Sequence, residues 1–179
     1  AQPGDTLTMT EGVWIDQEIL FEGNGTEDAK IVLRAARPGY VILTGESKLN
    51  IAGHWLVVDG LRFLNGYSSS SDVIQFRASS SRLAHHCRLT NTAIVNYDPP
   101  DDTSYKWISM YGTHNRVDHC YIKGKTNEGA TLTIWADATP DSHRIDHNYF
   151  ADHPPLGRNG GETIRIGTSD WSMFDSNTI

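Results

Sequence analysis

The sequence predicts an all-β protein, a right-handed parallel β-helix, in one domain that covers residues 1–179. Three observations predict this fold. Turn residues are frequent, with 16 glycines and 7 prolines among 179 residues. Helical periodicity is scarce, and short apolar runs take its place. Two groups of these runs repeat along the chain with a period of roughly 29 residues.

The strand-like runs follow one another from the N-terminal third onward, separated by turn residues. They occupy 31–35, 40–44, 54–64, 71–77, 106–112, 130–136 and 162–167. Each is short and rich in β-branched or aromatic residues, as strands are.

The first repeat is a pentad with an apolar fifth residue. It covers 59–63, 85–89, 118–122, 146–150 and 175–179, and loop insertions vary the interval between its copies. Residues at equivalent positions of a solenoid stack on successive rungs. We therefore expect Phe63, Leu89, Ile122 and Phe150 to form one interior column.

The second repeat precedes the first within each unit and alternates apolar and polar side chains. It covers 49–51, 74–76, 108–110, 132–134 and 164–166. A leucine-rich repeat, an up-and-down sheet and a parallel β-helix all have such a period. The leucine-rich pattern and tight hairpin signals are both absent, so stacked parallel rungs explain the columns best. The last pentad ends at Ile179 without a cap, which predicts that the chain stops in mid-solenoid.

Charge and composition exclude some classes of protein. The net charge is −7, whereas a sequence-independent nucleic-acid binder should be basic. No apolar run has the roughly 18 residues of a membrane span. The chain opens AQPGDTL without an initiator Met, as a secreted or periplasmic protein does after signal removal, although a trimmed chain would look the same.

Several segments carry a resemblance to a known family. They are PGDTL (3–7), GTEDAKIVLRAARPGYVILTG (25–45), VVDGLRFLNG (57–66), NRVDHCYIKGKTNEG (115–129), RIDHNYF (144–150) and, most specific, PPLGRNGGETIRIGTSDWS (154–172). Together they resemble the sixth polysaccharide lyase family, that of alginate lyases and chondroitinase B. The resemblance covers nearly the whole chain and implies the same β-helix fold.

The resemblance implies β-elimination of a uronic-acid polysaccharide, most often alginate and less often dermatan sulfate. Such lyases remove the proton on C5 and expel the C4 oxygen. Calcium, held by an Asn and a Glu-x-Glu pair, neutralises the sugar carboxylate, while a Lys is the base and an Arg the acid. The resemblance places the Asn at Asn159. No catalytic residue is identified within the chain, because the base and acid are expected beyond Ile179.

Four further residues are candidates for binding the anionic substrate: Lys125, Arg158, Glu162 and Arg165. With Lys125 and Arg158, Arg165 would form a basic strip along one long face. Each candidate has a structural alternative. Asn159 can belong to a glycine-rich turn, Glu162 and Arg165 can form an ion pair, and Lys125 can be a solvated turn residue.

Other chemistry-bearing residues fit structural roles better. His86, His119 and His147 are expected to stack on separate rungs, which argues against a zinc site. Cys87 and Cys120 are expected to be stacked free thiols. Tyr105, Trp107, Tyr111 and Trp135 offer faces for a sugar, although alternation must place some of them in the core.

Two rival functions remain beside the lyase. One is a non-catalytic β-helix, such as an adhesin or a carbohydrate-binding solenoid. The other is a different β-helix carbohydrate enzyme, an epimerase or a hydrolase. The charged, glycine-rich loop NGGETIRIG (159–167) favours the lyase, because a purely structural solenoid does not need it.

Overall fold

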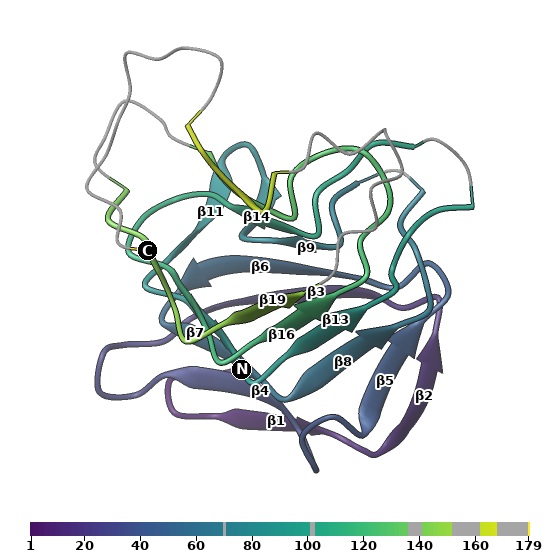
Figure 1. Ribbon diagram of the computed structural model, residues 1–179. Coiled ribbons are helices and arrows are strands. Elements are labelled where there is room, and N and C mark those ends of the chain that lie inside the picture. The colour runs from purple at the N-terminus through teal and green to yellow at the C-terminus, as the bar shows by residue number, and fades with distance from the viewer. Residues whose placement is uncertain (70, 101–102, 136–140, 152–161, 168–178) are drawn as a thin grey trace.

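The computed structural model confirms an all-β parallel β-helix (Figure 1). It describes residues 1–179 apart from 70, 101–102, 136–140, 152–161 and 168–178. Every regular element in the described residues is a strand, and the strands form three sheets. Among the same residues, no helix has the length and apolar character that crossing a membrane requires.

Each rung contributes one strand to each sheet. Sheet A contains β1 (Thr6–Met9), β4 (Ile31–Ala35), β7 (Leu56–Asp59), β12 (Arg88–Thr90), β15 (Arg116–Asp118) and β18 (Arg144–Asp146). Sheet B contains β2 (Gly12–Ile15), β5 (Val41–Thr44), β8 (Leu61–Leu64), β13 (Ala93–Val95), β16 (Tyr121–Lys123) and β19 (Tyr149–Ala151).

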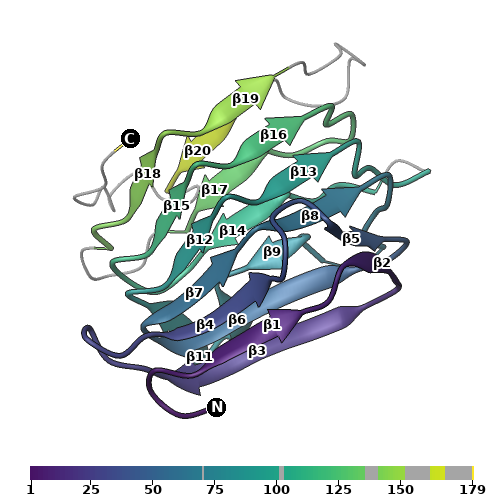
Figure 2. The ribbon, with the colours of Figure 1, turned by 90° about the horizontal axis from the view of Figure 1, so that it is seen from below.

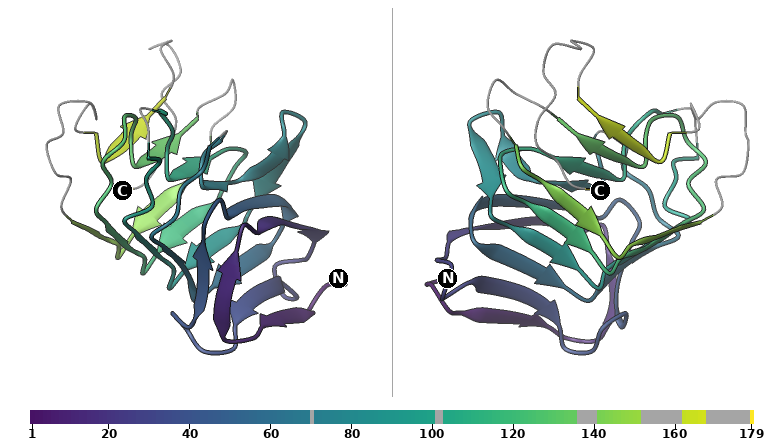
Figure 3. Two further views of the ribbon diagram at one scale, coloured as in Figure 1. Left: turned by 90° about the vertical axis from the view of Figure 1, so that its right-hand side faces the viewer. Right: turned by 60° about the vertical axis from the view of Figure 1, so that its left-hand side comes forward.

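Sheet C contains β3 (Glu18–Asn24), β6 (Lys48–His54), β9 (Ile74–Gln75), β14 (Ile108–Met110), β17 (Leu132–Ile134) and β20 (Ile164–Ile166), with β10 (Arg77–Ser79) and β11 (Arg82–His85) at its side. Figure 2 shows the rungs rising from β1 and β3 at one end to β18, β19 and β20 at the other. The two side views in Figure 3 show the same order of rungs.

Apolar side chains from the three sheets fill the centre of the solenoid. In sheet B one interior column runs from Leu43 through Phe63, Ile94 and Ile122 to Phe150. The predicted column is therefore correct at Phe63, Ile122 and Phe150 and wrong at Leu89, whose place is taken by Ile94.

The error at Leu89 comes from an insertion in its rung. Strands β10 and β11 form an antiparallel pair, and β11 joins the edge of β6. These extra residues shift the repeat, so the true pentad of this rung is 90–94 instead of 85–89. Leu89 lies in sheet A, between Val58 and Val117, and is buried there.

The corners between sheets need one residue with a left-handed backbone. At the corner from sheet A to sheet B these are Gly60, Asn91, His119 and His147, with φ of 81°, 50°, 52° and 57°. Glycine adopts this conformation freely, and Asn and His are enriched there among other residues. The second position of the pentad therefore has to hold a residue that tolerates a left-handed backbone.

Corner residues of successive rungs stack outside the core. His119 stacks on His147 with ring centroids 5.0 Å apart, as predicted. His86 instead belongs to the corner from sheet C to sheet A, where it stacks on His114 at 4.6 Å. The prediction that His86 stacks in line with His119 and His147 is therefore wrong. As for Leu89, the cause is the β10–β11 insertion, which shifts the repeat in this rung.

Both cysteines are buried free thiols, as predicted, but they do not stack on each other. The Cys87 backbone N–H donates to Asn115 Oδ1, and the Cys120 backbone N–H donates to Asn148 Oδ1, both at 2.9 Å. Each cysteine therefore sits beneath an asparagine of the next rung, at different corners of the solenoid.

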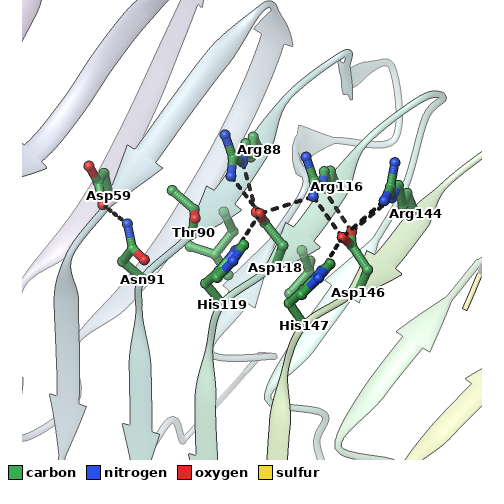
Figure 4. Close-up of polar contacts among 12 residues, drawn as sticks. Asp59, Arg88, Thr90, Asn91, Arg116, Asp118, His119, Arg144, Asp146 and His147 are labelled. Atoms are coloured by element: carbon green, nitrogen blue, oxygen red, sulfur yellow. Dashed lines mark hydrogen bonds and ion pairs between the residues drawn. The ribbon is translucent and has the colours of Figure 1, made fainter.

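Alternating charges connect the later rungs along sheet A (Figure 4). Arg88 donates from Nε and Nη2 to the two Asp118 oxygens at 2.7 and 2.5 Å, and Arg116 donates in the same way to Asp146 at 2.8 and 2.6 Å. His119 also contacts Asp118, at 2.8 Å. Asp118 is completely buried. We call these five residues the sheet A ladder.

Candidate functional site

The outer face of sheet C carries a column of polar residues, because the neighbouring positions point into the core. Its members Gln75, Ser109, Thr133 and Arg165 are paired in register from β9 to β20. The apolar residues on either side of them, such as Ile108 and Met110, are buried. This confirms the second repeat found in the sequence and places Arg165 on the same face as Ser109.

Two positions further along each strand lies a second outward column, formed by Arg77, Tyr111 and Trp135. The Arg77 guanidinium carbon lies 3.8 Å from the centre of the Tyr111 ring. The Tyr111 and Trp135 rings are parallel within 5°, with centroids 5.8 Å apart. Gly167 takes the next position and donates its N–H to Ile134 O, so it adds no side chain to the stack.

A buried hydrogen-bond chain fixes the orientation of Trp135. Its indole Nε1–H donates to Ser109 Oγ at 3.1 Å, and the Ser109 hydroxyl donates to Asp72 Oδ2 at 2.5 Å. The other Asp72 oxygen accepts the Lys106 backbone N–H at 2.9 Å. Ser109 and Asp72 are buried, so the indole is held in place before any ligand arrives.

The second column, together with Gln75 of the first, borders a groove of about 560 Å³. Segment 103–106 and residues 69, 71 and 72 also line it. Lys106 contributes the second cation, with Nζ 5.3 Å from the centre of the Trp135 ring. The groove therefore combines two cations, three aromatic rings, of which Tyr111 and Trp135 stack, several hydroxyl and amide groups, and the carboxylate of Asp72.

Within the described ranges these two cations contact aromatic rings and form no ion pair with a carboxylate. Arg77 Nε donates to the Gln75 amide oxygen at 3.2 Å, and the ring of Tyr111 supports its guanidinium. Burial raises the pKa of Tyr111 above its ordinary value, against the opposing effect of Arg77, so this phenol stays protonated at neutral pH. The groove can accordingly offer both cationic and hydroxyl donors to an anion.

Lys125 is completely buried, so the prediction that it lines an exposed groove is wrong. Its ammonium donates to Asn127 O at 2.6 Å, to Asn127 Oδ1 at 2.7 Å and to Glu128 O at 3.3 Å. Burial lowers the pKa of Lys125 to about 8. These three acceptors draw the side chain inward, where it ties together the turn at 125–128.

The other predicted site residues divide into two groups. Glu162 and Arg165 form the ion pair that was the structural alternative for these two residues. Both side chains stay partly exposed, so Arg165 remains accessible to a ligand. Arg158 and Asn159 lie outside the described residues, and their predicted roles stay predictions. The predicted basic strip thus retains Arg165 but loses Lys125.

Sequence reasoning missed Arg77 and Lys106. A signal for Arg77 was present, because it directly follows the triplet 74–76, as Tyr111 and Trp135 follow their triplets. Continuing the alternation by one step would have placed all three outside. Among the aromatic candidates, Trp107 is buried in the core, Tyr105 is buried but contributes to the groove lining, and Tyr111 and Trp135 border the groove. Nothing in the repeat marks Lys106.

A metal site does not emerge from the residues described. Among them, no three histidine, cysteine, aspartate or glutamate side chains are grouped so that they could hold an ion. Calcium normally takes six to eight oxygen ligands. Asn159, where the resemblance places one calcium ligand, lies outside the described residues, so calcium binding stays a prediction.

Comparisons with known proteins agree with this architecture. The profile of the chondroitinase B family matches residues 1–179. A comparison with curated proteins gave no match. Among solved structures, the alginate lyase AlyGC of polysaccharide lyase family 6 is 46% identical with a TM-score of 0.93, and the match covers 99% of this chain and 25% of that one.

Two further family 6 structures are similar. A mannuronic-acid-specific lyase from human gut microbiota is 35% identical, with a TM-score of 0.93 and coverage of 99% of this chain and 42% of that one. A lyase from Pseudopedobacter saltans is also 35% identical, with a TM-score of 0.85 and coverage of 93% and 38%. The chain thus spans between a quarter and about two-fifths of the length of these relatives. On the full-length profile match and these identities, the chain belongs to the chondroitinase B family, polysaccharide lyase family 6.

Proposed function

We propose that this chain forms part of an enzyme that cleaves alginate by β-elimination. One observation carries the proposal: 99% of the chain aligns with an alginate lyase at 46% identity. A second relative is described as specific for mannuronic acid, one of the two sugars of alginate. Dermatan sulfate is the second candidate substrate, because the matching family profile takes its name from chondroitinase B.

The reaction makes three demands on the protein. The C5 proton is weakly acidic beside a carboxylate, so positive charge must stabilise the anion formed when a base removes that proton. The C4–O bond then breaks, and the leaving oxygen takes a proton from an acid. Arg165 is one described cation that can meet the first demand, since it is partly exposed on the outer face of sheet C beside its ion-pair partner Glu162.

The base and the acid remain predictions for positions beyond Ile179. Lys125 does not qualify as the base in this structure, because its ammonium is buried and bonded to three acceptors. Calcium at Asn159 is also a proposal. Its other ligands must come from outside the described residues, and equilibrium dialysis of the chain and of Asn159→Ala against calcium would test it.

A long anionic polymer does not cross a membrane freely. We therefore propose that the protein acts outside the cytoplasm, in a secreted or periplasmic form. Fractionation of the source cells, followed by detection of the chain, would test this location.

The test of function uses polymannuronate, polyguluronate and dermatan sulfate as separate substrates. β-Elimination leaves a C4–C5 double bond, whose ultraviolet absorbance reports each cleavage. We expect product from alginate when the chain carries whatever natural sequence follows Ile179, and no product from the 179-residue chain alone. Equal rates from both forms would show that a base lies within this sequence. No product from any substrate would exclude the lyase.

A further inference from the structure

We propose that the groove bordered by Arg77, Lys106, Tyr111 and Trp135 is a binding subsite for a uronate residue of the polysaccharide chain. The identity of the sugar polymer rests on the proposed function above. The chemistry of the subsite, an anionic carboxylate on a hydroxylated ring, rests on the groove itself.

The anion is recognised by two cations that are held in place but not neutralised. Stacking on Tyr111 fixes the Arg77 guanidinium, and its Nε–H is bonded to the neutral Gln75 amide. An arginine has five N–H donors in a fixed fork, so most of them remain for a ligand. Lys106, which also lines the groove, adds three more donors, and neither cation has an ion-pair partner among the described residues.

The sheet A ladder provides a comparison, because its arginines have a structural role. There, Arg88 and Arg116 each meet a carboxylate through two hydrogen bonds. A stacked arginine without a carboxylate gains little for folding and keeps its affinity for an external one. Its place in the wall of the groove distinguishes Arg77 from Arg37, which stacks on Tyr40 and also forms no ion pair among the described residues.

The ring of the sugar has apolar C–H faces as well as hydroxyls. Tyr111 and Trp135 supply an apolar wall, and the chain from Asp72 through Ser109 prevents the indole from rotating. A rigid wall loses little entropy when a ligand binds. Asp72 lines the groove as well; it is 9% exposed, and its two oxygens accept hydrogen bonds from the Lys106 backbone and from Ser109.

The size and position of the groove also suit a sugar. Its volume of about 560 Å³ falls within the range of about 300–1,000 Å³ common for ligand sites. Arg165 lies in the same outward column as Ser109, two strands further along sheet C. Because neighbouring strands are about 4.8 Å apart, Arg165 lies roughly 10 Å from the position of Ser109 along the sheet. One polysaccharide chain can therefore contact both the groove and Arg165.

The experiment compares two double variants of the 179-residue chain with matched chemistry. The test variant is Arg77→Gln/Lys106→Gln. The control is Arg37→Gln/Lys30→Gln, since Arg37 stacks on Tyr40 at 3.7 Å and Lys30 lies 5.7 Å from the Trp55 ring centre, away from the groove. Both remove two stacked cations and change the net charge equally. Circular dichroism confirms that each variant is folded.

Binding of mannuronate and guluronate hexamers is measured by calorimetry, with methyl-esterified hexamers as uncharged probes. We expect the test variant to bind at least about tenfold more weakly and the control to stay within about twofold of the parent chain. The methyl esters should bind weakly to all three proteins. Arg77→Lys should fall between the parent and Arg77→Gln, since it keeps the charge and loses the fork.

Three results would overturn the subsite: equal affinities of the two double variants, no binding of either hexamer by the parent chain, or methyl esters that bind as well as the acids. These results are independent of catalysis. Cleavage of alginate by the extended form, with no effect of Arg77 and Lys106 on affinity, would leave the lyase standing and remove the subsite. Hexamer binding that depends on Arg77 and Lys106, without any cleavage of alginate, would support the subsite and exclude the lyase.

Discussion

The sheet A ladder and the groove on sheet C are built by the same stacking of rungs, yet their charges are treated in opposite ways. In the ladder, each arginine reaches the aspartate of the next rung, and the buried Asp118 receives hydrogen bonds from Arg88 and His119. In the groove, Arg77 stacks on an aromatic ring, and within the described residues it has no carboxylate partner. Satisfied charges stabilise the solenoid, and unsatisfied ones are available to a ligand.

The largest effect is expected from breaking the ladder. Asp118→Ala leaves Arg88 and His119 without their shared acceptor and opens a buried site. Removing one partner of a buried ion pair costs several kcal/mol, and partial exposure of Arg88 reduces this to about 2–3 kcal/mol. Urea unfolding measures it. The control is Asp59→Ala, an aspartate that accepts from Asn91 only, where we expect a loss of less than about 1 kcal/mol. Equal losses would mean that the ladder contributes nothing specific.

Acid should weaken the same ladder by titration. Burial by itself raises the pKa of Asp118, but hydrogen bonds from Arg88 and His119 and the nearby arginine charges bring it below its ordinary value. The Arg116 hydrogen bonds lower the pKa of Asp146 even further. The unfolded chain therefore takes up these protons first as the pH falls.

The stability that these two carboxylates contribute is fully present above their unfolded pKa of about 4 and is lost as the pH falls through the folded values. Thermal melting from pH 7 to pH 2 would show this loss. Asp146→Asn should flatten the curve below about pH 4. A variant curve parallel to that of the parent chain would contradict the assignment.

A smaller effect is expected from the hydrogen-bond chain beneath the groove. Ser109→Ala removes the acceptor of the Trp135 indole and one donor to Asp72, which should cost about 1–2 kcal/mol and free the indole to rotate. Hexamer affinity should fall with it. Thr133→Val is the control, because the buried Thr133 hydroxyl has no hydrogen-bond partner in the described part of the chain. Its loss should be below about 1 kcal/mol, with unchanged affinity.

The smallest change in stability is expected in the groove itself. Arg77→Gln/Lys106→Gln breaks no ion pair among the described residues, so we expect the free energy of unfolding to change by less than about 1 kcal/mol. Urea unfolding at high and low salt would measure it. A loss as large as that of Asp118→Ala would mean that these cations serve folding, and the contrast between the two regions would disappear.

The sequence by itself determined the fold class, because the apolar triplets and pentads repeat in register along the chain while hairpin signals and the leucine-rich pattern are absent. It also determined the column from Gln75 to Arg165, since these triplets alternate without interruption. The motif at 154–172 was the most specific indication of the family. Most of the fold and the family, but little of the site, could therefore be predicted.

Only the tertiary structure decided which residues share a rung and which charges meet. The β10–β11 insertion moved Leu89 into sheet A and put Ile94 in its place, a shift that no local pattern marks. Lys125 looked like a solvated turn residue, yet the structure buries it, with its ammonium bonded to three acceptors of its own turn. Arg77 and Lys106 line one groove because segments from successive rungs fold together there. Local sequence specifies the alternation along a strand, whereas burial and charge pairing depend on neighbours a full turn of the solenoid away, which only the stacked rungs bring together.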